Sequence, residues 1–284
     1  MRGMYHPVTA SPFKCTNTYM ELAPCDGLNP YIRCFWGSEK PYVKTDAFYD
    51  IVVPDTCVDI IYNIDYTDNK IMGRFCGIND SSFCASDEYN QGHLISTFAI
   101  RFYAWGAYAF SQDSLKDTLN GFYNISSRFH WLDIELSQRL FEINSLSERV
   151  NFVENLFLNR LLKVRENNLI NGVIDNIILN KGTLSVERLA KDSFISIRQL
   201  ERLFNEYIGI TPKKLNNLVR YQFLWNDILR NPDFNVLDAV YKYGYTDQPH
   251  LIREFKRYHT MDIKKAIQYA YDNVGNIQYF HGGY

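Results

Sequence analysis

Short apolar segments alternate with polar turns over the front of the chain. The segments 50–63, 70–76 and 94–103 are rich in β-branched and aromatic residues, and Gly, Pro, Asp and Asn separate them. Such segments between turn signals are typical of strands in a β-sandwich or a barrel. Because Pro54 and Asp55 interrupt the first segment, we expect it to form a strand pair or one bent strand.

From about residue 111 the apolar positions change to helical spacing. Leu136 and Leu140 lie one turn apart, and a more amphipathic stretch runs from Ser147 to Lys163. Residues 166–168 (Glu-Asn-Asn) break this pattern. We therefore predict two domains, residues 1–168 and residues 169–284, which makes the fold class α+β: a β-rich barrel or sandwich with trailing helices, then an all-α domain.

The last part of the chain contains an internal repeat at an offset of 51 residues. Segments 196–214 and 247–265 share six of 19 positions without gaps, and the pairs are Leu200/Leu251, Arg202/Arg253, Phe204/Phe255, Tyr207/Tyr258, Lys213/Lys264 and Lys214/Lys265. Leu, Phe and Tyr at i, i+4 and i+7 form one buried face of a helix. The repeated arginine points elsewhere, so packing does not explain it.

Each copy is preceded by a second, shorter amphipathic segment with its own start signal. The predicted N-cap residues of the helices in this region are Ser185, Ser196, Thr211, Asn235 and Asp247. Pro212 opens the long helix between the copies, and Gly244 is expected to adopt the left-handed conformation at a turn. Two short helices joined by a tight turn form a helix-turn-helix, whose second helix fits a DNA major groove. The pattern predicts two such units joined by a long helix.

Four stretches carry a more specific pattern: Leu189–Ala190, residues 196–204 (SIRQLERLF), residues 209–212 (GITP) and residues 244–257 (GYTDQPHLIREFKR). With these motifs, residues 182–270 resemble the DNA-binding domain of AraC/XylS-type transcription regulators. The resemblance implies a seven-helix domain with two reading helices. Phe194 stands where a turn glycine is usual in that family, and Thr260 and Asp262–Ile263 replace the usual Gly and Thr-Pro of the second copy.

The resemblance places base contacts at Arg198, Glu201 and Arg202 in the first unit, and at Gln248, Pro249 and Arg253 in the second. Arginine pairs with guanine O6 and N7, glutamate accepts from cytosine N4, and glutamine reads adenine. Phosphate contacts are expected from cationic side chains and from backbone amides at the helix starts. The predicted DNA-binding set is Ser196, Arg198, Gln199, Glu201, Arg202, Asn205, Gln248, Pro249, His250, Arg253, Lys256 and Arg257. The alternative for each charged member is a solvated or salt-bridged side chain.

Charge is unevenly distributed along the 284 residues. The whole chain has a formal net charge of −2, which by itself argues against a nucleic-acid partner. Residues 181–270, however, hold 15 Lys+Arg and 10 Asp+Glu, a net charge of +5, and the remaining residues hold 15 and 22, a net charge of −7. The C-terminal part is therefore mildly basic, and we expect its binding to double-stranded DNA to weaken strongly with salt.

The front domain has the character of a sensor or dimerisation domain. Residues 53–63 and 100–108 resemble a β-rich, cupin-like domain of unassigned function that precedes some AraC-type readers. Aromatic walls with one cation suit a small polar or anionic ligand. The predicted pocket residues are Trp36, Tyr62, Phe75, Arg101, Tyr103 and Trp105, and the alternative for each is a core or surface role. The helix from Ser147 to Lys163 either pairs with its copy in a homodimer or packs on its own barrel.

Catalytic and metal-binding signals are sparse in the front domain. Its three histidines, His6, His93 and His130, are widely separated, so we expect no metal and no cofactor. The six cysteines lack C-x-x-C spacing, and reduced core thiols are the simplest interpretation of them: Cys15, Cys25, Cys34, Cys57, Cys76 and Cys84. No apolar run of about 18 residues predicts a membrane span, and the first seven residues lack the apolar stretch of a secretory signal.

These features together predict a cytoplasmic, non-enzymatic, sequence-specific transcription regulator. Its expected partners are double-stranded DNA, a small-molecule effector in the front domain, and RNA polymerase if it is an activator. Two alternatives stay open. One is a DNA repair or modification enzyme with its catalytic centre in the front domain, and the other is a regulator that senses oxidation through its cysteines.

Overall fold

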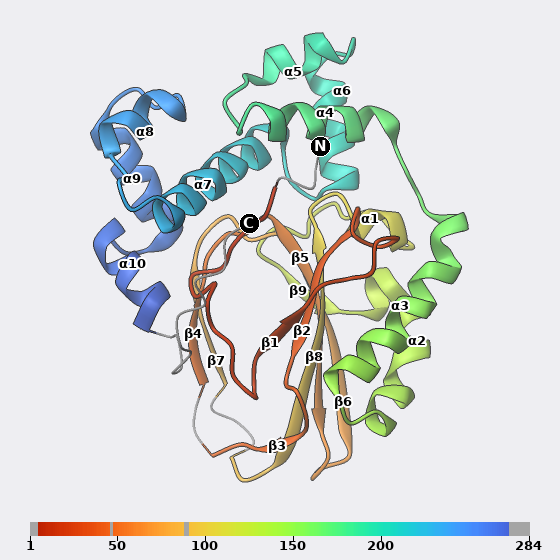
Figure 1. Ribbon diagram of the computed structural model, residues 1–284. Helices are drawn as coiled ribbons and strands as arrows, with labels where there is room; N and C mark the ends of the chain where they lie inside the picture. Colours follow the sequence, from red (N-terminus) through yellow and green to blue (C-terminus); the bar gives the residue numbers. More distant parts are fainter. Residues whose placement is uncertain (1–4, 46–47, 88–90, 273–284) are drawn as a thin grey trace.

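The computed structural model describes residues 5–45, 48–87 and 91–272. A β-rich front part is followed by an all-helical back part (Figure 1), which confirms the predicted fold class. The division at residue 168 stays a prediction, although α4 (Asn168–Leu179), which contacts the helices that follow it, begins at that residue. No helix among the described residues has both the length and the apolar character that crossing a membrane requires.

The front part is built on a seven-stranded antiparallel sheet. Its path is β1-β2-β8-β5-β6-β9, and β3 also pairs with β8. The strands are β1 (Met20–Leu22), β2 (Ile32–Gly37), β3 (Tyr42–Val43), β5 (Cys57–Asp65), β6 (Lys70–Cys76), β8 (Leu94–Tyr103) and β9 (Phe122–Asn124). A separate two-stranded sheet pairs β4 (Phe48–Val52) with β7 (Phe83–Asp87). Figure 1 shows this pair on one side of the main sheet and the helices of the front part on the other.

The predicted strands at 70–76 and 94–103 are confirmed as β6 and β8. The segment 50–63 contributes to two strands, β4 and β5, which belong to different sheets and do not pair with each other. The turn between them explains the separation. Thr56 has a positive φ of 59°, and the Asp55 side chain accepts a hydrogen bond from the backbone N–H of Cys57 at 3.0 Å.

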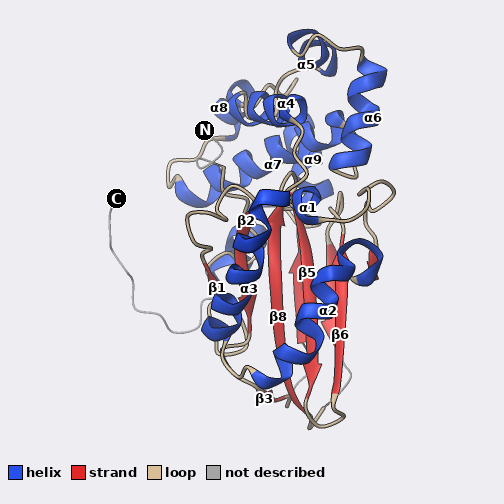
Figure 2. Cartoon of the chain, turned by 90° about the vertical axis from the view of Figure 1, so that its right-hand side faces the viewer, coloured by secondary structure: helices blue, strands red, loops and turns tan. Residues whose placement is uncertain are grey.

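Two helices cover one face of the main sheet (Figure 2): α2 (Ser126–Glu142) and α3 (Leu146–Arg160). Aromatic rings fill the space between the layers. The Phe102 ring of β8 lies 6.1 Å from Phe129 of α2 and 5.7 Å from Phe157 of α3, measured between centroids. The amphipathic stretch expected from Ser147 begins one residue earlier, at Leu146, because the Ser145 side chain accepts a hydrogen bond from the N–H of Glu148 and caps the helix. Two short helices complete the front part, α1 (Ala107–Phe110) and η2 (Leu161–Lys163).

The back part contains seven helices among the described residues, as the family resemblance implies. They are α4, α5 (Val186–Asp192), α6 (Ile197–Tyr207), α7 (Pro212–Arg230), α8 (Val236–Lys242), α9 (Gln248–His259) and α10 (Ile263–Asp272). The long helix α7 is the hub, since α4, α6 and α9 all contact it. Asp262 starts α10 by accepting a hydrogen bond from the N–H of Lys265 at 2.9 Å, so an acidic cap replaces the Thr-Pro start usual in the family.

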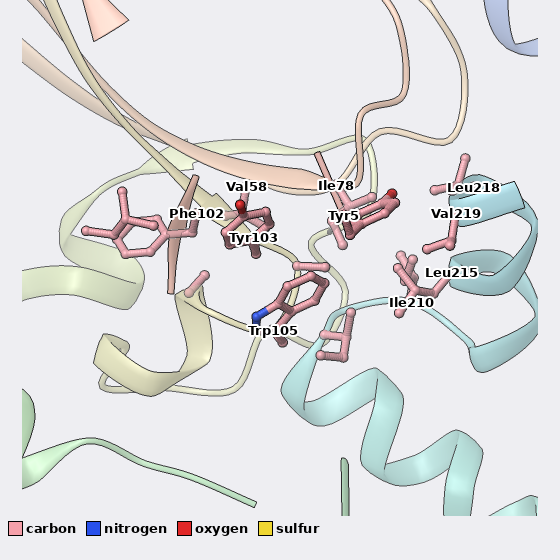
Figure 3. Packing of buried hydrophobic residues seen from close by; sticks show 14 of the residues in the cluster. Tyr5, Val58, Ile78, Phe102, Tyr103, Trp105, Ile210, Leu215, Leu218 and Val219 are labelled. Carbon is pink, nitrogen blue, oxygen red and sulfur yellow. The ribbon is translucent and has the colours of Figure 1, made fainter. Parts of the chain in front are cut away.

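Front and back parts share one hydrophobic layer (Figure 3). Ring and aliphatic side chains from the sheet and its loops, including Trp105, face Ile210, Leu215 and Leu218 at the start of α7. Tyr5 is inserted between the two sets and is 1% exposed. Burying an aromatic ring of this kind contributes about 2 kcal/mol. The two parts are therefore packed together rather than joined by a free linker.

An extended N-terminal segment, which we call the strap (residues 5–13), lies along α7. Gln222 of α7 donates to the carbonyl of Val8 at 3.1 Å and accepts from its N–H at 2.7 Å. Trp225 Nε1 donates to the carbonyl of Thr9 at 3.0 Å, and the Asn226 amide donates to the carbonyl of His6 at 2.8 Å. These hydrogen bonds attach the strap to the linker helix.

Candidate nucleic-acid interface

The two predicted helix-turn-helix units are present, α5–α6 and α8–α9. Their second helices begin at the predicted caps: the Ser196 hydroxyl accepts from the N–H of Gln199 at 3.2 Å, and the Asp247 carboxylate accepts from the N–H of His250 at 2.7 Å. The remaining backbone N–H groups of each first turn have no helical acceptor and suit a phosphate oxygen. The local sequence thus builds two helix starts of the kind that bind nucleic acid.

Both turns contain a residue in the left-handed region. Gly244 has a φ of 65°, as predicted, and Phe194 has a φ of 55° although it carries a side chain. That conformation costs a residue with a Cβ about 1–2 kcal/mol. Phe194 is 95% exposed, so no packing of its ring within the described residues compensates for this strain.

The linker helix α7 fixes both units. Its Asn216 donates to the carbonyl of Leu184, just before α5, at 2.9 Å. Near its middle, Arg220 makes a two-pronged ion pair with Glu254 of α9, at 2.7 and 2.8 Å, and its guanidinium lies 4.4 Å from the centre of the Tyr245 ring. Because a bidentate pair fixes orientation as well as distance, the second reading helix is held rigidly on the linker.

Most of the predicted DNA-binding residues are exposed on α6 and α9. Two of the twelve are half-buried, Asn205 and His250. The His250 ring packs edge-on against Tyr245 at 5.3 Å between centroids. The ten exposed residues are Ser196, Arg198, Gln199, Glu201, Arg202, Gln248, Pro249, Arg253, Lys256 and Arg257. Their role in DNA binding stays a prediction.

The arginines at the reading positions are free to bind a ligand. Among the described residues, Arg198, Arg202 and Arg253 make no hydrogen bond and no ion pair. Arg257 lies over the ring of its neighbour Tyr258, with 5.6 Å between its guanidinium carbon and the ring centre. The salt-bridged alternative therefore does not apply to the three reading arginines within the described part of the chain.

The front part also contacts the first unit directly. The N–H of Leu115 and the hydroxyl of Ser114 both donate to the carbonyl of Glu206, at 2.9 and 3.2 Å. Lys214 of α7 pairs with Asp80 at 2.5 Å, which lowers the pKa of that carboxyl. Lysine at this repeated position thus holds the front part, a role that the sequence repeat did not indicate.

The predicted pocket residues do not form one group. Tyr62 and Phe75 are fully buried in the core of the front part. Trp36 and Arg101 lie together, since Trp36 Nε1 donates to Asp59 and the Arg101 guanidinium pairs with the same carboxylate. Trp105 stacks on Tyr103 and lines a small cavity of about 70 Å³ beside α1, and Arg101 lines a larger one of about 140 Å³ beneath the strap.

One group in the described part of the chain has metal-ligand chemistry, and it consists of Asp65, Asp68 and His93. Its carboxylates already have partners. Asp65 accepts from His93 at 2.8 Å and from two backbone N–H groups, and Asp68 pairs with Lys70 at 2.9 Å. Those bonds account for the geometry without an ion.

The cysteines are unpaired and lie in different environments. Cys34, Cys57 and Cys76 are buried, and burial raises the pKa of each thiol, to about 12 for Cys76. A thiol with a raised pKa stays protonated and reacts slowly with oxidants. Cys15 and Cys84 are exposed, so the expectation of core thiols holds for only part of the set.

The sequence matches known domain families and one characterised regulator. Residues 189–266 match the model of a helix-turn-helix domain, and residues 20–122 match a domain of unknown function (DUF6597). The HTH-type transcriptional activator RhaS of Salmonella arizonae is 28% identical over 115 residues, which cover 37% of this chain and 41% of that protein. The back part is an AraC-type DNA-binding domain. The chain matches less than half the length of RhaS.

The solved structures that match the chain have lower sequence identity. An AraC-type regulator from Chromobacterium violaceum is 19% identical, with a TM-score of 0.34, and the match covers 37% of this chain and 93% of that one. ToxT from Vibrio cholerae is 14% identical, with a TM-score of 0.40, and the match covers 83% of this chain and 98% of that one. Similarities this weak assign no ligand and no activity to the present chain.

Proposed function

We propose that this protein is a transcription regulator that binds double-stranded DNA through α6 and α9 of its AraC-type domain. The observation that carries the proposal is the pair of helix-turn-helix units with exposed arginines at equivalent places, Arg202 and Arg253, which pair with no side chain in the described part of the chain. Two reading helices on one rigid linker would contact two successive major-groove segments on one face of the duplex. The proposal includes action in the cytoplasm.

We propose that the front part regulates DNA binding by the back part. It contacts α6 and α7 through hydrogen bonds and an ion pair, so a change in its packing would alter how the reading helices are presented. A small-molecule effector would act there. RhaS is named a transcriptional activator, and we propose that this protein likewise activates, through contact with RNA polymerase. A homodimer through α3 would present two DNA-binding domains to one promoter.

Two features argue against the alternatives, a DNA repair or modification enzyme and a regulator that senses oxidation through its cysteines. The raised pKa values of Cys34, Cys57 and Cys76 argue against these three thiols as a nucleophile or an oxidation sensor, and say nothing of the exposed Cys15 and Cys84. The carboxylates of the acidic group around Asp65 already bind its own neighbours, since Asp65 accepts from two backbone N–H groups and Asp68 pairs with Lys70. We therefore assign the front part no catalytic role.

Selection from random duplexes tests the proposal. Purified full-length protein, incubated with a random DNA library, should enrich a site with two conserved blocks about one helical turn apart. Binding to the selected site should also fall steeply as salt rises, because bound cations of the DNA are released on association. Recovery of unenriched sequence, with the same affinity for all duplexes, would overturn the proposal.

A further inference from the structure

The reading faces of α6 and α9 differ at two of three repeat-related positions. With the offset of 51 residues, the pairs are Arg198/Pro249, Glu201/Ile252 and Arg202/Arg253. The arginine is kept, whereas α9 has an apolar residue where α6 has a cation and a second one where α6 has an acid. Ile252 therefore occupies a reading position, although the DNA-binding set predicted from sequence does not include it.

Ile252 lies on the exposed side of α9. It is 39% exposed, whereas Leu251 and Phe255, on the opposite side of the helix, are buried. Residues three apart on a helix are neighbours, so Ile252 lies beside the exposed Pro249. Arg253, one turn after Pro249, continues the same face. We call Pro249 and Ile252 the apolar strip.

The face that contains the apolar strip has no hydrogen-bond acceptor among its side chains. Its other members, Arg253 and Lys256, are donors only. The nearest acid in sequence, Glu254, is held on the linker side of α9, because Arg220 donates to its two carboxylate oxygens at 2.7 and 2.8 Å and Tyr245 donates to it at 2.8 Å. The α9 face therefore presents cations and apolar surface, whereas the matching face of α6 includes a carboxylate.

We infer that the apolar strip reads thymine through its C5 methyl group, beside a guanine bound by Arg253. In the major groove, thymine is the base that carries a methyl group, and guanine presents two acceptors, O6 and N7. The amino groups of cytosine and adenine find no side-chain acceptor on this face. This inference rests on the proposed function and names the bases that one of its two reading helices selects.

The two reading helices then select different bases. Glu201 on α6 accepts from cytosine N4, whereas the apolar strip on α9 selects a methyl group. Two unlike reading faces on one rigid linker fit an asymmetric site in a single orientation.

Deoxyuridine tests the apolar strip, because it differs from thymidine in the C5 methyl group alone. The site selected from the random library is synthesised with deoxyuridine in place of each thymidine of the block whose recognition depends on Arg253. Fluorescence anisotropy then measures the binding of purified full-length protein to each duplex. We expect about fourfold weaker binding at the thymine that the strip contacts, which is the value of one buried methyl group.

Matched variants assign the methyl contact to Ile252. Ile252→Ala should bind the thymidine and deoxyuridine duplexes with nearly equal affinity, because the surface that covers the methyl group is removed. Ile252→Val keeps a branched apolar surface and should keep the response. Ile197→Ala removes an isoleucine of equal exposure, 39%, from α6 and should respond to deoxyuridine in this block as the wild type does.

Three results would overturn the assignment: a block without thymine, equal affinity of the wild type for every deoxyuridine duplex, or the same loss in Ile252→Ala as in the wild type. The first two need no variant, so they test the apolar strip even if Ile252→Ala fails to fold. Enrichment of no site would refute the proposed function itself. A protein that enriches a site and tolerates deoxyuridine throughout the block refutes only the thymine contact.

Discussion

Acidification should destabilise the back part through a single residue, His259, the last residue of α9. Its side chain has no exposed surface, and its ring stacks on Phe255 at 5.0 Å and meets Trp225 edge-on at 4.5 Å between centroids. Nδ1 lies 2.8 Å from the hydroxyl of Tyr221, and Nε2 is buried and has no hydrogen-bond partner among the residues that the structure describes. Burial of this kind lowers the pKa of His259 to about 4.

The sign of the effect follows from where the proton binds. An unfolded chain protonates histidine near pH 6.5, whereas the folded protein keeps His259 neutral down to about pH 4. Between these values the unfolded state holds more protons, so the free energy of unfolding decreases as the pH falls. The full gap corresponds to about 3 kcal/mol, of which about 2 kcal/mol is lost between pH 7 and pH 5.

The assay compares urea unfolding of the full-length protein and of His259→Phe at about pH 7 and pH 5. Phenylalanine keeps the stack on Phe255 and leaves the Tyr221 hydroxyl without its partner, which costs about 1 kcal/mol at both pH values. We expect the variant to lose about 2 kcal/mol less than the wild type on acidification. His130→Gln, at an exposed histidine of α2, is the control. Equal losses for wild type and His259→Phe would refute the reasoning.

Three further changes test other parts of the structure. Phe194→Gly should raise the free energy of unfolding by about 1 kcal/mol and Gly244→Ala should lower it by a similar amount, because both positions have positive φ. Thermal unfolding measures both variants, and a loss of stability in Phe194→Gly or a gain in Gly244→Ala would contradict this. Gly209→Ala should loosen the contact between the front part and the back part, since an added Cβ would lie 2.6 Å from the carbonyl oxygen of Leu115. An unchanged rate of limited proteolysis between the two parts would argue against this. Glu254→Gln should destabilise the second unit by about 2 kcal/mol by leaving Arg220 without its carboxylate, and unaltered hydrogen exchange in α9 would exclude that role.

The helix starts of the AraC-type domain could be predicted from sequence because a cap is a local interaction. Ser185, Ser196, Thr211, Asn235 and Asp247 each accept a hydrogen bond from an N–H two or three residues later, as predicted. Such a bond depends on the residues of one turn and little else. The 51-residue repeat added the second unit, because two similar segments bury similar faces.

Contacts between distant segments could not be predicted in the same way. Alternation along β5 and β6 shows that successive residues face opposite sides of a sheet, but it does not show which side receives α2 and α3. Tyr62 and Phe75 face that covered side, so they are core residues rather than a pocket wall. Arg33 of β2 and Arg230 of α7 line the same cavity beneath the strap, although no local pattern connects them.

One cap shows a signal that the periodicity obscured. The start of α3 lies at Ser145, whose partner Glu148 stands three residues later, the spacing of a capping box. The apolar pattern was traced from Val150, which favours a start near Ser147, whereas the helix includes Leu146, which is also buried. Capping chemistry was the better guide at this boundary.

Base-by-base specificity of two arginine variants tests the central claim most directly. With the selected DNA site in hand, binding of wild type, Arg202→Ala and Arg253→Ala is measured against every single-base change in both conserved blocks. We expect each variant to lose about 1–3 kcal/mol of discrimination in one block only, a different block for each. Arg139→Ala, on the surface of α2, should change neither block. Loss in both blocks from either variant, or full discrimination by both, would contradict two separate reading helices.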